Sequence, residues 1–163
     1  MGTKYTRRAG YDPAGRDGLR LSECWDEGMR TKHGIHVHGF PNMFIVQPTQ
    51  GANLISNVPH NLTEAGRTIA MTIKHAVDHG FDQIEVTKDA EDAWLELLLT
   101  GPGMMLANPD CTPGYYNNEG QAPRPGGELF VGYPAGAMAY FHYIDGWRSS
   151  GEFEGLEFRR RPR

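Results

Sequence analysis

The sequence has few segments with the apolar periodicity that regular secondary structure requires, and this scarcity limits the folds open to the chain. The clearest periodic segment places apolar residues at the spacing of one helix face: Leu62, Ala65, Ile69, Ile73, Ala76 and Val77. This spacing predicts an amphipathic helix from Asn61 to His79. Asn61 and Glu64 resemble a capping box at its start, and Gly80 is a suitable stop.

A second helix is predicted after Thr87, which is a good N-cap, and it should end at Gly101. Shorter signals indicate a strand at Met43–Gln47, a strand or extended link at Phe81–Thr87, a short helix or extended piece at Leu19–Trp25, and an apolar strand with an aromatic-rich segment between Leu129 and Trp147. The mixture predicts an α/β fold. One strong strand and two strong helices neither close a sheet nor cover a core, so we expect part of a domain.

The composition indicates much irregular structure, with 21 glycines and 11 prolines among 163 residues. Residues 1–18 should be an irregular lead, the stretch from Gly101 to Glu128 a long loop, and residues 159–163 a solvated basic tail. A net charge of −4 argues against nucleic acid or an anionic membrane as the main partner. With no secretory signal, no long apolar run and no cysteine motif, a cytoplasmic protein is expected.

The junction from Phe44 to Asn61 is the first candidate binding site, because small, turn-prone residues there link a predicted strand to a predicted helix. Gly51, Asn53 and Asn57 offer backbone freedom and amide groups next to a helix start, whose N–H groups favour a carbonyl or anionic ligand edge. Such loops also occur for purely geometric reasons. Tyr115, in a loop with Tyr116, could stack on a ring or simply pack in the core.

The histidines of "HGIHVHG" are a second candidate, since neutral imidazole is a common metal ligand. His36 and His38 alternate in a segment expected to be extended, and His33 lies nearby. No helical HExxH pair fixes a metal geometry, so these side chains are better explained as lining a polar cleft or the surface. The sequence also lacks a GxSxG nucleophile motif and any phosphate-binding glycine loop.

Taken together, four stretches resemble the carboxyl-terminal part of class B flavoprotein monooxygenases, in particular the Baeyer–Villiger monooxygenases. They are "SECWDEGMRTKHGIHVHGFPNMFIVQPTQGAN", "ISNVPHNLTEAGRTIAMTI", "EVTKDAEDAWLELL", and "CTPGYYNNEG" with the closing "YFHYIDGWRSSGEFEGLEF". They occur in the family's order and span Leu19 to Phe158. The family's two GxGxxG fingerprints and its FxGxxxHxxxW motif are not present in the sequence.

The resemblance implies part of a Rossmann-like FAD/NAD(P)-binding domain that lacks the amino-terminal dinucleotide-binding motifs. It implies FAD and NADP as cofactors, and a small organic ketone or sulfide as the substrate that receives one oxygen atom from O2. It places five residues near the flavin ring and Tyr115 near the nicotinamide; the five are Gln50, Gly51, Asn53, Ser56 and Asn57. It assigns no catalytic residue and no metal ligand to this chain.

Three hypotheses remain open from the sequence. The chain is a carboxyl-terminal piece of a monooxygenase that needs the missing amino-terminal domains as a partner, a non-catalytic remnant or interaction module, or a small metal enzyme built on the histidines. Under the first hypothesis the isolated chain should be inactive and poorly stable, because apolar surface would await those domains.

Overall fold

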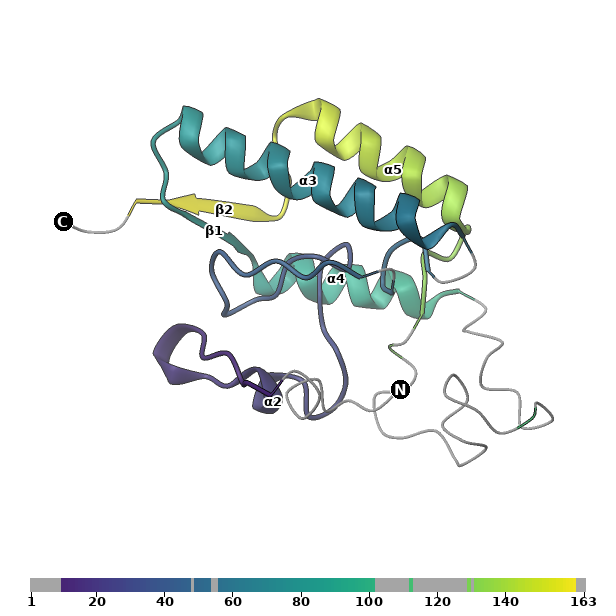
Figure 1. Ribbon diagram of the computed structural model, residues 1–163, viewed down its shortest axis with the longest axis horizontal. Coiled ribbons are helices and arrows are strands. Elements are labelled where there is room, and N and C mark those ends of the chain that lie inside the picture. Colours follow the sequence, from purple (N-terminus) through teal and green to yellow (C-terminus); the bar gives the residue numbers. More distant parts are fainter. Residues whose placement is uncertain are drawn as a thin grey trace.

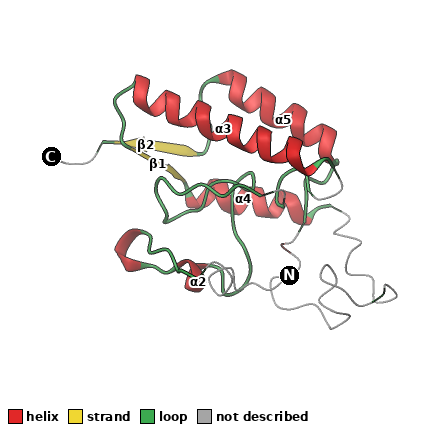
Figure 2. Ribbon diagram, viewed as in Figure 1, coloured by secondary structure: helices red, strands yellow, loops and turns green. Residues whose placement is uncertain are grey.

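The computed structural model describes residues 10–47, 49–53, 56–101, 112, 129 and 131–160. In chain order its elements are the 3-10 turn η1 (Arg16–Gly18), α2 (Leu21–Cys24), α3 (Val58–Asp78), β1 (Gln83–Val86), α4 (Lys88–Leu99), α5 (Ala137–Ser150) and β2 (Leu156–Arg159). Figures 1 and 2 show α3 and α5 running side by side, with the short sheet beneath them and α4 lower in the view. The α/β expectation is confirmed at this coarse level.

The sheet consists of β1 and β2, which pair antiparallel with Gln83 opposite Arg159 and Val86 opposite Leu156. The strand predicted within Phe81–Thr87 is confirmed as β1, whereas β2 was not predicted. Arg159, assigned to a basic tail, forms the last pair of the sheet. Arg160 then donates hydrogen bonds to the carbonyls of His79 and Gly80, so both Arg159 and Arg160 contact the rest of the chain.

Helix α3 begins three residues earlier than predicted, so the assignment of Asn61 as its N-cap is wrong. Asn57 is the N-cap, and its side chain accepts a hydrogen bond from the His60 N–H at 3.0 Å. Pro59 lies in the first turn, where a missing N–H costs no helical hydrogen bond. Asn61 is instead a buried residue inside the helix, with its amide turned back to the preceding loop.

Helix α4 begins as predicted, because the Thr87 hydroxyl accepts a hydrogen bond from the Ala90 N–H at 3.2 Å. It ends at Leu99, two residues before the predicted stop. The aromatic-rich segment predicted between Leu129 and Trp147 forms α5, and the described residues before it form no named strand, so the apolar strand expected there is not found among them. Tyr140, Ile144 and Trp147 have i, i+4, i+7 spacing and are the buried face of this helix.

The predicted strand Met43–Gln47 is wrong. Phe44 forms only an isolated bridge with His36, and the Ile45 N–H donates one further hydrogen bond to the Ile35 carbonyl. A turn precedes this segment, with positive φ at Gly39 (83°) and Asn42 (60°). These two contacts do not extend into a β-ladder, so the segment is irregular and is not a strand.

Two apolar clusters hold these elements together. The larger joins α4, α5, the segments on either side of α5 and the loop before α3: Ala52, Trp94, Leu95, Leu98, Leu129, Val131, Tyr140, Ile144, Trp147 and Phe153. The smaller packs α2 on the turn that follows it: Leu21, Trp25, Val37 and Phe40. No helix in the described residues is long and apolar enough to cross a membrane.

A buried ion pair connects α3 to α5. The Arg148 guanidinium is 2% exposed and lies 2.6 Å from the Glu64 carboxylate, with Asp145 at 3.1 Å. It also donates a hydrogen bond to the Glu64 carbonyl at 3.3 Å. Removing one member of such a pair leaves an uncompensated charge in the interior, which costs more than the pair itself contributes.

We therefore predict that Arg148→Leu lowers the free energy of unfolding by about 3 kcal/mol, as measured by urea denaturation. The double variant Arg148→Leu with Glu64→Leu should recover most of this loss, because both charges are then removed. Lys74→Ala, which breaks an exposed pair with Asp78 in the same helix, should change the unfolding free energy by less than about 0.5 kcal/mol. Equal losses in all three proteins would contradict this account.

Candidate functional site

The structure brings the five loop residues predicted as a flavin site together immediately before α3. Gln50 and Gly51 are fully buried, and Asn53 is 6% exposed. Ser56 is half-buried and Asn57 is exposed. Tyr115, the sixth predicted site residue, lies outside the described residues.

Gln50 fixes the start of this loop through its side chain. Its amide nitrogen donates hydrogen bonds to the carbonyls of Met29 (2.6 Å) and Leu129 (2.9 Å), and its amide oxygen accepts one from the Thr31 hydroxyl (2.5 Å). Gln50 has a positive φ of 57°, a conformation that is unusual for a residue with a side chain. The three hydrogen bonds offset the cost of this conformation and join segments that lie 19 to 79 residues apart.

The backbone of the loop is held from the other side by residues 131–133. The Gln50 N–H donates to the Val131 carbonyl at 2.7 Å, and the Tyr133 N–H donates to the Gly51 carbonyl at 2.9 Å. Gly132 fits between them, because a Cβ there would lie 2.5 Å from the Cβ of Asn53. Any larger residue at position 132 would push the loop outward.

The end of the loop is tied to the first turns of α3. The Asn61 amide nitrogen donates to the Asn53 carbonyl at 2.8 Å, and the Ser56 hydroxyl donates to the Asn61 amide oxygen at the same distance. Pro59 has no N–H and Asn57 accepts that of His60. By helix geometry the first-turn N–H of Val58 therefore has no acceptor within the helix and is available to a ligand.

A layer of aromatic rings lies under the loop. Trp94 stacks on Tyr133 and Tyr143 at ring-centroid distances of 5.7 and 5.4 Å, and its indole N–H donates to the Gln50 carbonyl at 3.0 Å. The Tyr140 hydroxyl donates to the His33 carbonyl at 3.0 Å. Burial raises the pKa of Tyr140 well above its ordinary value, so this hydroxyl keeps its proton at any physiological pH.

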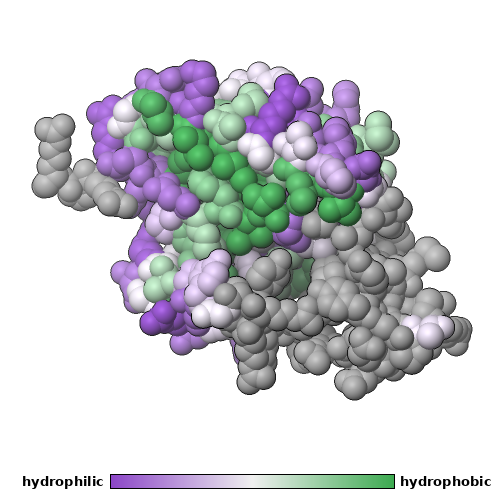
Figure 3. All heavy atoms as spheres, viewed as in Figure 1, coloured by the Kyte–Doolittle hydropathy of each residue, from purple (hydrophilic) through white to green (hydrophobic). Residues whose placement is uncertain are grey.

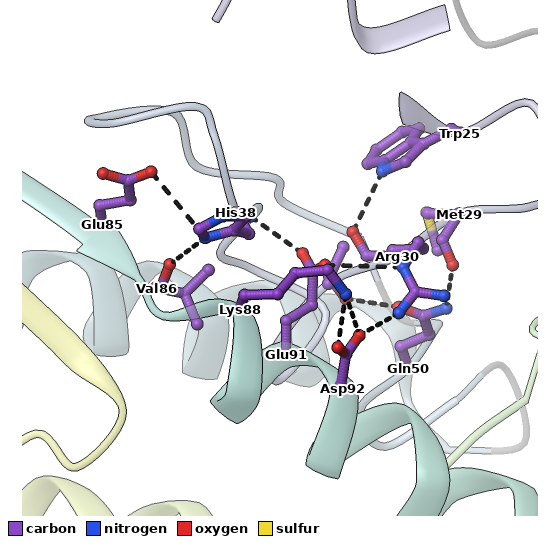
Figure 4. A network of polar contacts seen from close by, with 11 residues as sticks. Trp25, Met29, Arg30, His38, Gln50, Glu85, Val86, Lys88, Glu91 and Asp92 are labelled. Carbon is purple, nitrogen blue, oxygen red and sulfur yellow. Dashed lines mark hydrogen bonds and ion pairs between the residues drawn. The ribbon is translucent and has the colours of Figure 1, made fainter. Parts of the chain in front are cut away.

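A polar network braces residues 25–38 against α4 (Figure 4). Arg30 pairs with Asp92 and lies 3.6 Å from the buried Glu91 carboxylate. That carboxylate accepts a hydrogen bond from the His38 N–H at 2.9 Å. Burial raises the pKa of Glu91, while this hydrogen bond and Arg30 act in the opposite direction. The network fixes the position of Met29, whose carbonyl is one of the acceptors for Gln50.

Glu85 on β1 is a second buried carboxylate and accepts a hydrogen bond from the Gly39 N–H at 3.0 Å. Arg16 pairs with it directly, and Arg159 of β2 lies 3.5 Å away. The neighbouring His38 ring has its Nδ1 atom 2.9 Å from the Val86 carbonyl, so Nδ1 carries a proton. These contacts attach the turn at residues 38–39 to the sheet.

The three histidines considered as metal ligands are held in different surroundings. His33 is buried with its ring edge-on to Trp94 and Trp147, both at 4.7 Å, whereas His38 is bonded to the sheet. The described residues contain no group of three or more His, Cys, Asp or Glu side chains that could hold a metal ion. The expected extended segment is interrupted by a turn at residues 33–35, which separates His33 from His36, whereas no turn separates His36 from His38.

Sequence reasoning did not identify the residues that support the loop, which include Trp94, Gly132, Tyr133 and Tyr140. The spacing of Tyr140 with Ile144 and Trp147 is a helical signal that could have identified the buried face of α5. No local pattern reveals that Gly132 must lack a side chain, because the atom it would strike comes from a residue 79 positions earlier.

Comparison with known proteins finds close relatives over nearly the whole chain. The chain is 38% identical over 152 residues to an FAD-binding monooxygenase of Hypomyces subiculosus, covering 93% of this chain and 25% of the relative. It is 34% identical over 151 residues to Baeyer-Villiger monooxygenase 4 of Dietzia sp., covering 91% and 24%. No protein-family profile matches the sequence.

The fold has a solved counterpart in the polycyclic ketone monooxygenase of the fungus Thermothelomyces thermophila, with a TM-score of 0.84 and 30% sequence identity. The likeness covers 97% of this chain and 26% of the fungal chain. In each of these comparisons the chain spans about a quarter of the length of the protein it matches.

Gln50→Ala should lower the free energy of unfolding by about 3 kcal/mol in urea denaturation, because two buried carbonyls and a hydroxyl lose their partner. Gln50→Gly is the matched control, since it also relieves the positive φ and should be somewhat less destabilising than alanine. If both variants unfolded at the wild-type denaturant concentration, the loop would not depend on this side chain.

The buried His36 makes stability depend on pH. Burial, and then nearby Lys32, lower its pKa from 6.5 to about 3, so the folded state resists a proton that the unfolded state accepts. Stability is therefore fully present above pH 6.5 and is lost as the pH falls towards 3. Between pH 7 and pH 5 this histidine should cost about 2 kcal/mol.

The variant His36→Phe cannot take up a proton and retains a ring next to Phe44, its neighbour at 5.6 Å. Its unfolding free energy should fall less steeply than that of the wild type between pH 7 and pH 5, with a difference of about 2 kcal/mol by urea denaturation. Parallel curves for the two proteins would show that His36 is not protected from protonation.

Proposed function

The chain belongs, as a partial sequence, to the family of Baeyer–Villiger and FAD-binding monooxygenases, and from this we propose that it supplies the flavin-facing loop of such an enzyme. The whole enzyme would use FAD and NADPH to transfer one oxygen atom of O2 to a small organic substrate. A ketone is the proposed substrate and a sulfide the alternative, because the family oxidises both classes. When bound and reduced by NADPH, FAD would supply the chemistry that activates O2.

The observation that carries this proposal is the construction of the loop from Gln50 to Asn57. It is held on both sides by hydrogen bonds to distant segments and leads directly into α3. A flavin ring needs a rigid surface with a donor for the carbonyl edge that becomes electron-rich on reduction. The Val58 N–H and the positive end of the α3 dipole are suited to that edge.

The loop residues would contribute to flavin binding in different ways. Gln50 and Gly51 are buried and would shape the surface beneath the ring, while Asn53 and Ser56 set the path of the chain between them and α3. Asn57 caps α3 and so orients its first turn. The chain's own part in the reaction would be to position the ring and exclude water from one of its faces, with no proton transfer assigned to these residues.

At the level of the fold, we infer that the described elements complete a larger Rossmann-like FAD/NAD(P)-binding domain. The small antiparallel sheet of β1 and β2 is too short to be such a domain by itself. The likeness to a ketone monooxygenase, over 97% of the chain at a TM-score of 0.84, supports this placement. We also propose that Tyr115 contacts NADP.

The proposal can be tested in a chimera, in which this chain replaces its matching segment in the Dietzia monooxygenase. The purified chimera should retain about one FAD per protein and convert a cyclic ketone to its lactone with NADPH, as measured by absorbance and by mass spectrometry. A folded chimera that retains FAD but forms no lactone and no sulfoxide would overturn the proposed activity.

Gly51→Val tests the loop itself, because even a Cβ at Gly51 would lie 3.1 Å from the Tyr140 ring. In the chimera we expect FAD affinity to fall by at least about tenfold, or about 1.4 kcal/mol, as measured by fluorescence titration. The control is Gly146→Ala in α5, where a Cβ meets nothing within 4 Å, and it should bind FAD normally. Equal affinities in the two variants would count against a flavin contact at this loop.

A further inference from the structure

Helix α3 has an arrangement of side chains opposite to that of an ordinary surface helix. Its buried residues are small or polar: Asn61, Ala65, Thr68, Thr72 and Ala76. Its larger aliphatic residues lie on an adjacent face, which we call the α3 stripe: Leu62, Ile69, Ile73 and Val77. Ile73 is 42% exposed and Val77 is 69% exposed. Figure 3 shows an apolar band on the surface over this helix.

The small residues explain how α3 packs within the chain. Alanine and threonine on its buried face allow close approach to α5 and β1, with which α3 packs. The stripe plays no part in those contacts at its carboxyl-terminal end, where Val77 faces water. Contiguous large aliphatic side chains on a helix surface mark an interaction site. A strip from Leu62 to Val77 extends over about 22 Å of helix.

Two observations indicate what covers the stripe. The first is length, because each relative has about three quarters of its chain outside the matched region. The second is position, because Leu62 lies one helical turn beyond Asn57, at the end of the loop proposed to face the flavin. A protein part that holds the flavin against this loop must approach the same end of α3.

We propose that the α3 stripe is the docking surface for the flavin- and NADP-binding part of the monooxygenase. This inference rests on the proposed function, since the occupant is identified through the flavin loop. Ile73 and Val77, the most exposed members, become buried in the assembled enzyme, and Leu62 connects the interface to the loop. The apolar contact thus places α3, and with it the Val58 N–H, against the bound cofactor.

The first test measures the accessibility of the stripe directly. Val77→Cys is made in the isolated chain and in the Dietzia chimera, with Cys24, Cys111 and the other cysteines replaced by serine, and its reaction with a maleimide is timed. The thiol should react at least about tenfold more slowly in the chimera, because docking excludes the reagent. Lys74→Cys, exposed on the same helix but outside the stripe and away from the loop, should react at similar rates in both proteins.

Similar labelling rates for Val77→Cys in the two proteins would overturn the proposal. A chimera that carries the unaltered stripe and does not fold would also overturn it. Ile73→Asp provides a second measurement. It should lower the melting temperature of the chimera more than that of the isolated chain, where Ile73 is already 42% exposed. An equal change in both would assign Ile73 to the internal packing of the chain.

Self-association is the competing explanation for the stripe. If light scattering shows that the isolated chain is a dimer, and Val77→Asp converts it to a monomer, the stripe is an interface between two copies and the proposal is wrong. Lactone formation is scored separately in the same samples. Protection of Val77 without any lactone or sulfoxide would leave the docking surface in place and refute the activity.

Discussion

The buried amide of Gln50 is the interaction on which the candidate site depends. It satisfies two carbonyls and one hydroxyl at once, in an interior where an unpaired polar group is costly. No apolar side chain could do this, because the carbonyls of Met29 and Leu129 both require a donor. The loop therefore has one well-defined position, set by three segments that are distant in sequence.

The buried charged side chains around the site also hold particular segments in position. Glu85, Glu91 and Arg148 are all nearly inaccessible to solvent, and each faces an opposite charge. Buried ion pairs contribute little net stability, because desolvation offsets most of their attraction. Their effect is better described as geometric: each carboxylate accepts hydrogen bonds from a particular backbone or guanidinium group and so fixes a turn or a helix in place.

Much of the helical structure could be predicted from the sequence, since helix signals are local. Thr87 as an N-cap and the apolar spacing of α3 needed no knowledge of the rest of the chain. The start of α3 was misplaced because Asn57 and Asn61 are both good caps, and the tertiary contact of Asn61 with the loop decides between them. The predicted strand at Met43–Gln47 failed because a strand requires a partner that runs beside it for several residues.

The loop residues could be named from the sequence, but not the means by which they are held. Gln50 carried no sign that its side chain would be fully buried, and the aromatic layer under it comes from α4, α5 and Tyr133, all far along the chain. The sequence also predicted exposed apolar surface without locating it. Only the structure shows that this surface lies on α3, because the small residues of that helix occupy its buried face.

The long separations in these contacts have a consequence for biosynthesis. The hydrogen bond from Tyr140 to His33 spans 107 residues, and the strand that pairs with β1 ends at Arg159. Contacts between such distant residues cannot form until both have left the ribosome, and closing such large loops slows folding. The loop before α3 therefore leaves the ribosome well before residues 129–133, whose hydrogen bonds hold it, and it acquires its final shape only after they follow.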